Sequence, residues 1–421
     1  MNLATPILHP LATRVSVPGS KSHTNRALLV AALAEGTTTL ENALFSDDSR
    51  CMAAALAGLG FDIRLDPAAS AMTVAGLGGR IPAKRADLFT GNAGTAARFL
   101  TAMLTLGHGE YRLDGVKRMR QRPIQHLLEA LNHLGARVEA PTGCPPVHIR
   151  AAGLPGGEAS IRGDVSSQFL SGLLMVTPCA RGPVDVRVDG PLHSKPYVNL
   201  TLGVMADFGV EIQREGFSRF RVTPQGYRSP GCYPIESDAS AASYFFAAPA
   251  ICGGWVEVAH LSRSARQGDI AFLDVLAGMG CTVTESADAI RVTGPERLRG
   301  IDVDMGDISD TAQTLAAIAP FAQTPTTIRG VASSRLKETD RITAACTELT
   351  RLGVRVDEHP DGLTIYPCDH LYPATIRTYE DHRMAMAFAL PGLRVPGIKI
   401  EKPDCVTKTF PNYFDVLGSL A

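Results

Sequence analysis

Cationic and hydroxyl-bearing side chains gather ahead of an apolar segment near the start of the chain. Residues 18–26 read PGSKSHTNR, and the apolar run ALLVAALA follows at 27–34. The free N–H groups of a helix start attract anions, and Lys21 and Arg26 add positive charge beside the hydroxyl of Ser22. The segment lacks the GxxxxGK[ST] spacing of a P-loop. It predicts either a binding site for a phosphate or carboxylate, or an ordinary capped helix with solvated cations.

Similar groups recur at later junctions between loops and predicted helices. GNAGTAAR at 91–98 places two glycines around an Asn, a pattern that predicts a nest of backbone N–H groups at a helix start. The segments RMRQRP at 118–123, GDVSSQF at 163–169 and HSKPY at 193–197 add cations, hydroxyls and an amide. Each segment alone is compatible with a capped helix or a solvated loop. Together, in a chain of net charge −1, they favour a small ligand with several negative charges or two anionic ligands.

The second half of the chain adds carboxylates that can exchange protons. Asp310 stands just ahead of an apolar segment, where its side chain is predicted to cap a helix. In LKETDR at 336–341, a helix would place Lys337 and Arg341 on one face beside Glu338, and two stacked cations need an anion. The same half of the chain holds two further cations, Arg383 and Lys408. A solvated helix face is the alternative interpretation of each segment.

The length and composition of the chain indicate a globular protein of at least two domains. It has 421 residues, of which 45% are hydrophobic and 20% are charged. The near balance of 41 Lys and Arg against 42 Asp and Glu argues against binding to nucleic acid or an anionic membrane. No apolar run approaches the length of a membrane span, and residues 1–20 do not resemble a signal peptide. Nine scattered cysteines without a CxxC pair predict a reduced, cytoplasmic protein, and no metal or organic cofactor is expected.

A unit of about 70 residues repeats along the chain. A helix end, a glycine and a short alternating strand recur around the repeat glycines Gly60, Gly135, Gly209, Gly280 and Gly353, and FDVLGSLA resembles a truncated sixth copy around Gly418. Glycine is favoured just past a helix end because it adopts a positive φ without strain. Six α+β units predict one ring or two groups of three. The Pro/Gly-rich stretch 225–235 is the predicted linker, with a second crossing near 17–20 and a ligand-binding cleft between two globules.

These motifs, in their order along the chain, resemble the 3-phosphoshikimate 1-carboxyvinyltransferase family, also called the 5-enolpyruvylshikimate-3-phosphate (EPSP) synthases. The resemblance runs from Pro18 to Phe414, nearly the whole chain. It rests on PGSKSHTNR, GNAGTAAR, QRPI, VSSQFL, SKPY, ESDASAASYF, LKETDR, YEDHRMAM and TKTFPNYF. Such a series of matches in one order is highly specific.

The resemblance implies an α/β fold, a two-domain inside-out α/β barrel of six βαβαββ repeats, three in each globular domain, with an active-site cleft between the domains. It implies one domain at 20–236 and a discontinuous one at 1–19 plus 237–421. The implied reaction transfers the enolpyruvyl (carboxyvinyl) group of phosphoenolpyruvate to the 5-hydroxyl of shikimate 3-phosphate and releases phosphate. The implied partners are these two substrates, with glyphosate as a candidate inhibitor, and the protein is expected to be a monomer.

The functional residues of the family are carried over at matching positions. The resemblance implies that shikimate 3-phosphate is bound by Lys21, Ser22, Arg26, Ser166, Ser167, Gln168, Ser194, Tyr197, Asp310 and Lys337. It implies that phosphoenolpyruvate is bound by Lys21, Asn92, Gly94, Arg122, Gln168, Arg341, Arg383 and Lys408. Asp310 is the implied general base at the 5-hydroxyl. Glu338, with Lys21 or Lys408, is the implied donor of a proton to the methylene carbon of phosphoenolpyruvate.

Three positions depart from the pattern of the family. Ser333 stands where an Asn that contacts the shikimate ligand is usual, and Ser237 replaces a common Gly at the crossing between domains. Phe99 stands where many members have Pro, and its ring is expected to shift the helix that carries Gly94 and so alter the response to glyphosate. Gly94 itself favours sensitivity, so the two features act in opposite directions.

Three other kinds of protein offer alternative interpretations. A UDP-N-acetylglucosamine enolpyruvyl transferase would have Lys-Asn in place of Lys21-Ser22 and a reactive Cys ahead of Arg122, but residues 110–122 contain no Cys. An RNA 3′-phosphate cyclase would need a nucleotide-adduct His and a basic surface. A non-catalytic anion-binding repeat protein would share the cationic helix starts but would have no use for Asp310 and Glu338.

Overall fold

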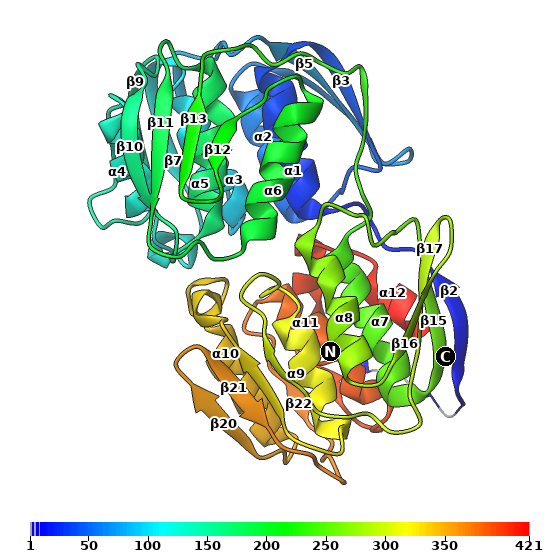
Figure 1. The fold of residues 1–421 in the computed structure, drawn as a ribbon. Coiled ribbons are helices and arrows are strands. Elements are labelled where there is room, and N and C mark those ends of the chain that lie inside the picture. Colours follow the sequence, from blue (N-terminus) through cyan, green and yellow to red (C-terminus); the bar gives the residue numbers. More distant parts are fainter. Residues whose placement is uncertain (1, 4–5, 8, 421) are drawn as a thin grey trace. The chain divides into compact units, whose positions relative to one another are not determined.

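The computed structural model describes residues 2–3, 6–7 and 9–420, and the chain divides into two compact units (Figure 1). Unit 1 comprises residues 1–18 and 236–421, and unit 2 comprises residues 19–235. The chain passes from one unit to the other after Pro18 and again after Ile235. Residues 1, 4–5, 8 and 421, which belong to the first domain expected from the sequence, lie outside the described residues.

Unit 2 contains three four-stranded sheets of one topology. Their spatial orders are β14 (Cys232–Pro234), β3 (Glu35–Glu41), β5 (Ala71–Leu77), β4 (Asp62–Asp66); β6 (Arg85–Phe89), β7 (His108–Asp114), β9 (Val147–Ala152), β8 (Val138–Glu139); and β10 (Gly157–Arg162), β11 (Val184–Asp189), β13 (Arg219–Val222), β12 (Gln213–Glu215). In each sheet the first two strands are parallel and the other pairs are antiparallel. A parallel pair needs a crossover connection, and a helix supplies it within the second and third sheets.

Unit 1 repeats this topology. Its sheets, written from the parallel pair onward, are β2 (Leu11–Val15), β15 (Gly254–Ala259), β17 (Ala289–Thr293), β16 (Thr282–Glu285); β18 (Asp302–Asp304), β19 (Thr326–Arg329), β21 (Gly362–Ile365), β20 (Val356–His359); and the three-stranded β22 (Thr375–Ile376), β23 (Lys399–Ile400), β1 (Asn2–Leu3). Strand β2 pairs in parallel with β15, so a strand from the start of the chain completes a sheet formed more than 230 residues later. Strand β14 completes the first sheet of unit 2 in the same way, beside β3.

The first helix of each repeat is buried on nearly all sides. These inner helices are α1 (Lys21–Leu33), α3 (Gly94–Leu104), α5 (Ser167–Val176), α7 (Ala239–Cys252), α9 (Ala312–Ile318) and α11 (His382–Ala387). Most of their residues are apolar or small, which is the pattern of a helix in a core, and their larger polar residues stand mainly near the helix starts. The second helices keep an exposed face: α2 (Asp47–Gly58), α4 (Gln125–His133), α6 (Lys195–Asp207), α8 (Phe272–Gly278), α10 (Arg341–Arg351) and α12 (Tyr413–Gly418).

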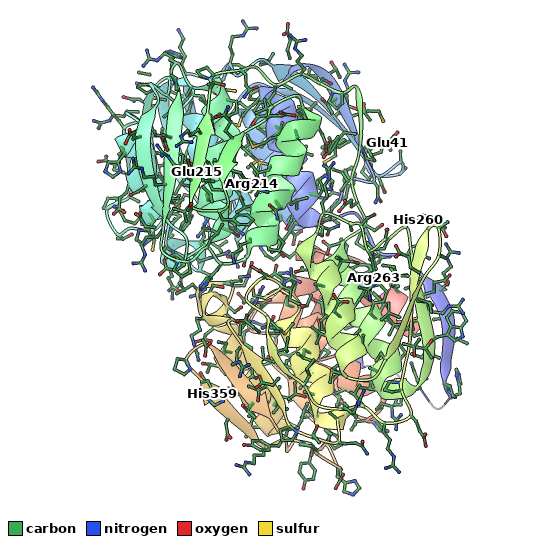
Figure 2. The ribbon with its side chains drawn as sticks, in the orientation of Figure 1. Glu41, Arg214, Glu215, His260, Arg263 and His359 are labelled. Carbon is green, nitrogen blue, oxygen red and sulfur yellow. The ribbon has the colours of Figure 1, made fainter. Side chains whose placement is uncertain are left out.

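Seven short 3₁₀ helices join these elements in the described part of the chain. They are η1 (Met119–Gln121), η2 (Thr177–Cys179), η3 (Gly268–Ala271), η4 (Ala319–Phe321), η5 (Ala332–Leu336), η6 (Leu390–Leu393) and η7 (Pro403–Lys408). Each unit has its own hydrophobic core, formed by the inner helices and the facing side of the sheets. Polar side chains such as that of Glu215 on β12 cover the outer side (Figure 2). The α/β fold of helix-inside repeats predicted from the sequence is confirmed.

Within the described residues, no helix combines the length and the apolar character that crossing a membrane requires.

The repeat glycines identify the end of the second helix in five repeats but not in the sixth. Gly209, for example, follows α6 with a φ of +83°, and the other four repeat glycines named above also have positive φ. Gly418 differs, because it is the last residue of α12 and its φ does not lie in the positive region. The truncated copy predicted around Gly418 thus has the second helix of the other repeats but lacks their left-handed glycine.

This contrast predicts opposite effects of one substitution at two glycines. A methyl group at either position meets no atom within 4 Å, so only the backbone conformation differs. Gly209→Ala should lower the free energy of unfolding by about 1–2 kcal/mol because an L-residue is strained at positive φ. Gly418→Ala should raise it by roughly 0.5 kcal/mol because alanine is the better helix former. Urea denaturation of both variants measures these changes, and equal effects would contradict the assignment.

Candidate functional site

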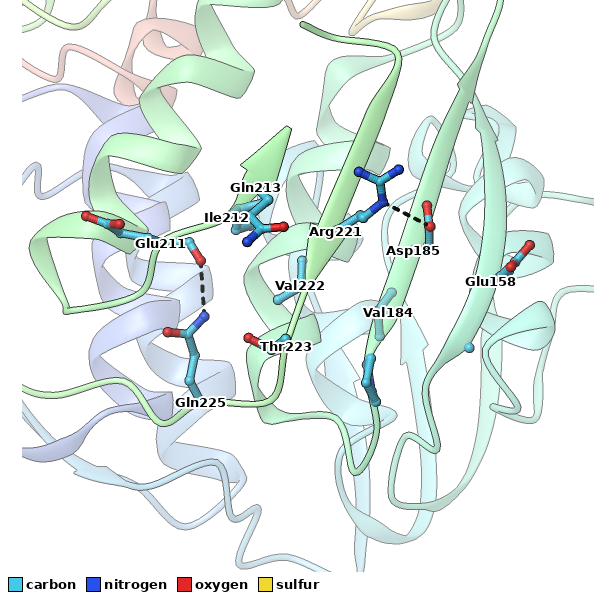
Figure 3. Close-up of a pocket in the computed structure, with 12 residues that line it drawn as sticks. Glu158, Val184, Asp185, Glu211, Ile212, Gln213, Arg221, Val222, Thr223 and Gln225 are labelled. Carbon is cyan, nitrogen blue, oxygen red and sulfur yellow. Dashed lines mark hydrogen bonds and ion pairs between the residues drawn. The ribbon is translucent and has the colours of Figure 1, made fainter. Parts of the chain in front are cut away.

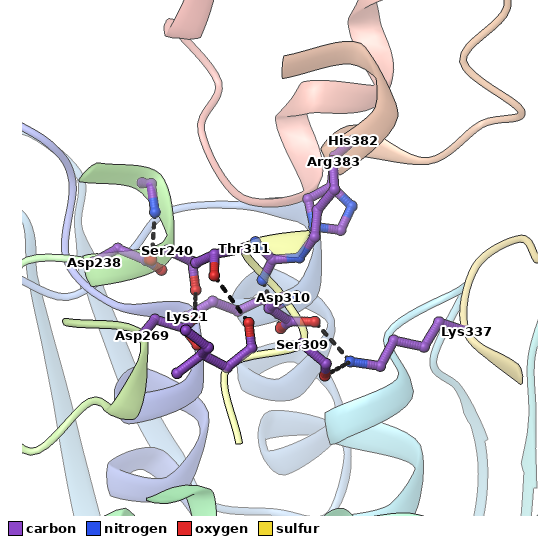
Figure 4. Close-up of polar contacts among 12 residues, drawn as sticks. Lys21, Asp238, Ser240, Asp269, Ser309, Asp310, Thr311, Lys337, His382 and Arg383 are labelled. Carbon is purple, nitrogen blue, oxygen red and sulfur yellow. Dashed lines mark hydrogen bonds and ion pairs between the residues drawn. The ribbon is translucent and has the colours of Figure 1, made fainter. Parts of the chain in front are cut away.

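Three cations of unit 1 converge on one carboxylate, that of Asp310. Lys337 Nζ lies 2.6 Å and Arg341 Nη1 3.1 Å from Oδ1 of Asp310, and Arg383 Nη2 lies 2.6 Å from Oδ2. Asp310 stands between β18 and α9, Lys337 and Arg341 come from the segment that leads into α10, and Arg383 comes from α11 (Figure 4). Three segments of the chain thus meet at one largely buried pair of oxygens.

Two local predictions around this carboxylate are wrong. Asp310 does not cap α9, because the N-cap residue is Thr311 and the carboxylate of Asp310 is occupied by the cations. Lys337 and Arg341 do not share a helix face, because residues 337–340 form a bend and α10 begins only at Arg341. The bend still brings both cations to one anion, the carboxylate of Asp310. The N-cap of α10 is Asp340, which accepts hydrogen bonds from two backbone N–H groups of the first turn.

Arg341 is the most buried cation of the cluster, with 1% of its side chain exposed. Its Nε donates to Oδ2 of Asp381 at 2.7 Å, and its Nη2 donates to Oε2 of Glu338 at 2.9 Å. Asp381 is also the N-cap of α11 and accepts a hydrogen bond from the backbone N–H of Arg383 at 2.9 Å. Glu338 in turn lies 3.7 Å from Nζ of Lys408, measured from Oε1. The planar guanidinium of Arg341 therefore donates hydrogen bonds to three carboxylates, those of Asp310, Glu338 and Asp381.

The surroundings of Asp310 favour its charged form. Burial alone would raise its pKa, but the nearby charges of Arg383, Lys337 and Arg341 outweigh burial and hold the pKa well below its usual range. Asp269, on η3, behaves in the opposite way: burial and the charge of Asp310 raise the pKa of Asp269 to about 6, and its carboxylate accepts a hydrogen bond from the hydroxyl of Ser240. A carboxylate held so strongly by cations accepts a proton poorly until those cations find another anion.

Unit 2 holds a buried cation at the second turn of α1. Arg26 is 1% exposed, and it donates from Nε to Oγ1 of Thr201 at 2.7 Å and from Nη2 to Oγ of Ser171 at 3.4 Å. It also donates to the backbone oxygens of Ser22 and Tyr197, at 2.9 and 3.2 Å. In the part of the chain that the structure describes, these partners are hydroxyl and carbonyl oxygens rather than carboxylates. Burial lowers the pKa of Arg26 to about 10, so the site would gain from a bound anion.

Lys21 and Ser22 are the first two residues of α1. The hydroxyl of Ser20, the N-cap residue, accepts a hydrogen bond from the backbone N–H of His23. Nζ of Lys21 lies 3.4 Å from the buried carboxylate of Asp48 in the first turn of α2. This partner was not predicted, because Asp48 lies outside the motifs recognised in the sequence.

Gly94 lies against the guanidinium of Arg122. A Cβ added at Gly94, the first residue of α3, would lie 2.5 Å from Nη2 and 2.8 Å from Cζ of Arg122. Nη1 of Arg122 donates to the backbone oxygen of Asn92 at 3.2 Å. The absence of a side chain at Gly94 therefore leaves room for a cation at the helix start, and the predicted residues Asn92, Gly94 and Arg122 lie in direct contact.

Two further helices of unit 2, the inner helix α5 and the second helix α6, present polar groups at their starts. Ser166 is the N-cap of α5, and its hydroxyl accepts a hydrogen bond from the backbone N–H of Gln168 at 3.3 Å. Nε2 of Gln168 lies 3.5 Å from Oγ1 of Thr95, so the starts of α5 and α3 are neighbours. Ser194, the N-cap of α6, has a left-handed backbone with a φ of +54°. The remaining predicted residues of this unit, Ser167 and Tyr197, lie in the first turns of α5 and α6.

Asp114 positions two of these segments at once. Its carboxylate accepts from Nε and Nη2 of Arg120 at 2.9 and 2.7 Å, and from Nη2 of Arg112 at 2.6 Å. Its backbone oxygen accepts from the N–H of Thr90 at 2.8 Å. The turn that carries Asn92 and the segment that carries Arg122 are thus tied to one residue at the end of β7. The hydrogen bond from Arg120 lowers the pKa of Asp114 against the opposing effect of burial.

The structure therefore groups the predicted residues within each unit. In unit 1 it brings together Asp310, Lys337, Glu338, Arg341, Arg383 and Lys408. In unit 2 it joins Arg26 with Tyr197, Asn92 with Gly94 and Arg122, and Gln168 with the start of α3. The sequence did not single out the supporting carboxylates Asp48, Asp114, Asp269 and Asp381 as site residues. Only Asp381 stood within a named motif.

A cavity elsewhere in unit 2 lacks the chemistry of this site. It has a volume of about 570 Å³ and lies on the outer side of the sheet that contains β10, β11, β13 and β12 (Figure 3). Its lining includes Glu158, Asp185 and Glu211, and the carboxylate of Asp185 is already paired with Arg219. None of the predicted site residues lines it. Among the described residues, no group of three or more His, Cys, Asp or Glu side chains has a metal-binding arrangement.

Comparisons with known proteins agree on one family. The sequence model of EPSP synthase (3-phosphoshikimate 1-carboxyvinyltransferase) matches residues 7–417. A 3-phosphoshikimate 1-carboxyvinyltransferase of Nostoc punctiforme is 53% identical over 407 residues, which cover 96% of this chain and 95% of that protein. Its counterpart in Shewanella denitrificans is 49% identical over 414 residues, covering 97% and 96%. A solved structure of an EPSP synthase from Acinetobacter baumannii matches with a TM-score of 0.83 and 25% identity, covering 100% of this chain and 98% of that one.

The role of Asp114 predicts a pH-dependent loss of stability on substitution. Because its pKa is lowered in the folded protein, its contribution is present above the unfolded value of about 4 and is lost as the pH falls through the folded value. Asp114→Asn should therefore lower the free energy of unfolding by roughly 1–3 kcal/mol at pH 7 and by much less near pH 2.5.

Asp87→Asn is the matched control for this measurement. Asp87 accepts hydrogen bonds from the same Arg112, but 69% of its side chain is exposed, so its loss should matter little. Urea denaturation at both pH values gives the comparison. A cost of Asp114→Asn that is independent of pH would contradict the assigned ionic role.

Proposed function

Since this chain belongs to the EPSP synthase family, the 3-phosphoshikimate 1-carboxyvinyltransferases of the shikimate pathway, we propose that its two polar clusters bind and activate the substrates of that reaction. The enolpyruvyl group of phosphoenolpyruvate is transferred to the 5-hydroxyl of shikimate 3-phosphate, and phosphate is released. Both substrates are small, multiply charged anions. Each unit contributes cations at helix starts, where anions are stabilised.

The observation that carries the proposal is the arrangement of Lys337, Arg341 and Arg383 around the carboxylate of Asp310. The reaction needs a base at the alcohol and cations at the carboxylate and phosphate of phosphoenolpyruvate. In the structure the base and the cations are in direct contact. The substrate can therefore take the cations only by releasing the base.

This exchange activates Asp310. In the free protein the three cations make its carboxylate a weak base. When phosphoenolpyruvate places its negative charges on Arg341 and Arg383, their attraction for Asp310 is shared with the ligand, and the pKa of Asp310 rises. The carboxylate then accepts the proton of the 5-hydroxyl as the hydroxyl oxygen attacks C2 of phosphoenolpyruvate. Burial strengthens each of these interactions because water does not screen them.

Protonation of the methylene carbon completes the addition. We assign this proton to Glu338, supported by Lys408, whose Nζ lies 3.7 Å from Oε1 of Glu338, or by Lys21. The electrons of the C2–C3 double bond take the proton at C3 while the new C–O bond forms at C2, which gives a tetrahedral intermediate. Loss of one C3 proton and of phosphate from C2 then restores the double bond. The cations stabilise the departing phosphate.

The remaining assignments follow the family residue by residue. In unit 2, shikimate 3-phosphate is held by Lys21, Ser22, Arg26, Ser166, Ser167, Gln168, Ser194 and Tyr197. The partners of buried Arg26 described above are hydroxyl and carbonyl oxygens, which supports this assignment, since a bound anion would balance its charge. Asp310 and Lys337 are the contributions of unit 1. Phosphoenolpyruvate is held by Lys21, Asn92, Gly94, Arg122 and Gln168 of unit 2, and by Arg341, Arg383 and Lys408 of unit 1.

The proposal also covers inhibition by glyphosate, the oligomeric state and the cellular location of the protein. Glyphosate is expected to compete with phosphoenolpyruvate at these cations. The ring of Phe99 is buried with its centroid 5.2 Å from Cζ of Arg26, so this residue links α3 to the cation of α1. We expect the protein to act as a monomer, and the scattered cysteines support a reduced, cytoplasmic setting.

Substitution of the base tests the proposal. Asp310→Asn keeps the shape of the side chain but removes the acceptor, and it should lower kcat by about 10²–10⁴-fold. The assay is phosphate release from phosphoenolpyruvate with shikimate 3-phosphate as acceptor, and with UDP-N-acetylglucosamine in parallel. Asp302→Asn, which removes an exposed partner of Arg329 in the same unit, should leave kcat within twofold of the original protein.

Either of two results would contradict the proposal. Phosphate release with UDP-N-acetylglucosamine but not with shikimate 3-phosphate would assign a different acceptor. Full activity of Asp310→Asn would remove this carboxylate from the chemistry.

A further inference from the structure

A wholly buried carboxylate, Glu348, lies in the middle of α10, one element away from the cation cluster. Its Oε1 accepts a hydrogen bond from the hydroxyl of Tyr379 at 2.7 Å. Its Oε2 accepts from the backbone N–H of Arg377 at 3.1 Å and from Nε of Arg351 at 3.0 Å. Burial and the bond to Glu348 raise the pKa of Tyr379 to about 12, so its hydroxyl stays a donor at neutral pH. None of the assignments above uses this carboxylate.

The residues that Glu348 holds belong to a strained turn. Tyr379 and Glu380 have φ values of +54° and +57°, so two successive residues with side chains adopt the left-handed conformation. Residues other than glycine rarely adopt it, and they keep it only where the surrounding contacts impose it. The bonds of Glu348 to Arg377 and Tyr379 are such contacts, because they fix the backbone before the turn and a side chain within it.

The strained turn leads directly into the cation cluster. The residue after Glu380 is Asp381, whose backbone N–H donates to the oxygen of Thr378 at 2.9 Å and closes the turn. Asp381 holds Arg341 from Nε at 2.7 Å and also begins α11, which carries Arg383. A relaxation at 379–380 would therefore move both the carboxylate that orients one arginine and the helix start that carries the other.

Simple reinforcement of the fold does not account for this arrangement well. A buried carboxylate costs desolvation free energy, and an apolar side chain on α10 would pack at lower cost. In the contacts above, the two oxygens of Glu348 accept hydrogen bonds from the loop that contains Arg377 and Tyr379 and from Arg351, whose side chain is 35% exposed. Strain beside functional groups, held by a dedicated buried partner, is a feature of positioned sites.

We propose that Glu348 and Tyr379 are positioning residues, which hold the left-handed turn at 379–380 so that Asp381 fixes Arg341 and α11 presents Arg383 to phosphoenolpyruvate. The inference rests on the proposed function, in which these two arginines bind phosphoenolpyruvate. Neither Glu348 nor Tyr379 touches a substrate in this account. Their loss should therefore weaken one binding step rather than the chemical step.

Tyr379→Phe tests the inference with the loss of a single oxygen. It should raise KM for phosphoenolpyruvate about tenfold, change KM for shikimate 3-phosphate less than twofold and change kcat less than threefold. Amide hydrogen exchange at Asp381 and Arg383 should become faster, because the turn that fixes their N–H groups loosens. Glu348→Gln, which replaces one acceptor oxygen by a donor facing Arg377 and Arg351, should act in the same direction.

Tyr366→Phe is the matched control. The hydroxyl of Tyr366 donates to Oδ2 of Asp357 at 2.8 Å, also a tyrosine-to-carboxylate bond of unit 1, but it lies on the strand side of the unit and not beside the turn. This variant should keep the KM values and the exchange rates of the original protein. Thermal unfolding midpoints of the two variants should be similar.

Arg383→Ala separates failure of this inference from failure of the proposed function. If it raises KM for phosphoenolpyruvate while Tyr379→Phe behaves like Tyr366→Phe, the positioning role alone is overturned. If Arg383→Ala leaves that KM unchanged, the assignment of the arginines fails and the inference fails with it. A rise in both KM values of Tyr379→Phe, together with a lower unfolding midpoint, would show a merely structural role and would also overturn the inference.

Discussion

The attraction between one buried carboxylate and three cations organises the candidate site. The carboxylate of Asp310 lies within 3.1 Å of Lys337 and Arg341, from the segment that enters α10, and of Arg383 on α11. Buried charges are stable only when paired, so none of these groups can move alone without leaving a partner uncompensated. An anionic substrate can enter the cluster only by replacing the carboxylate on the cations, and this replacement turns a weak base into a stronger one. Substrate binding and base activation are thus one electrostatic event.

The architecture explains why the polar groups collect at helix starts. In each repeat the first helix is surrounded by protein, and most of its side chains are apolar or small. Polar side chains can therefore reach a shared site only from the ends of such a helix, where free N–H groups already favour anions. The contact of Gln168 at the start of α5 with Thr95 at the start of α3 shows this for unit 2. Capping carboxylates such as Asp381 then act twice, on their own helix and on a neighbouring cation.

Much of the fold and of the site could be predicted from the sequence, because both depend on local sequence patterns and motifs. The repeat glycines indicated the period, and the motifs identified the family, whose resemblance implied the inside-out layering. Predictions failed where an ion pair overrode local preference: Asp310 gave up the cap of α9 for three cations, and the bend at 337–340 replaced a helical turn. Supporting carboxylates such as Asp114 and Glu348 stayed hidden, because their partners lie on other elements and only tertiary structure brings them together.

The pKa of Asp310 in the free and the substrate-bound protein tests the central claim most directly. Carbon-13 NMR of protein labelled at the aspartate side-chain carboxyl, assigned with Asp310→Asn, follows this group without turnover when phosphoenolpyruvate is added alone. The account predicts that Asp310 of the free protein stays ionised well below pH 4, and that its midpoint rises when phosphoenolpyruvate binds. An ordinary midpoint near 4 in the free protein, or a midpoint that phosphoenolpyruvate leaves unchanged, would contradict it.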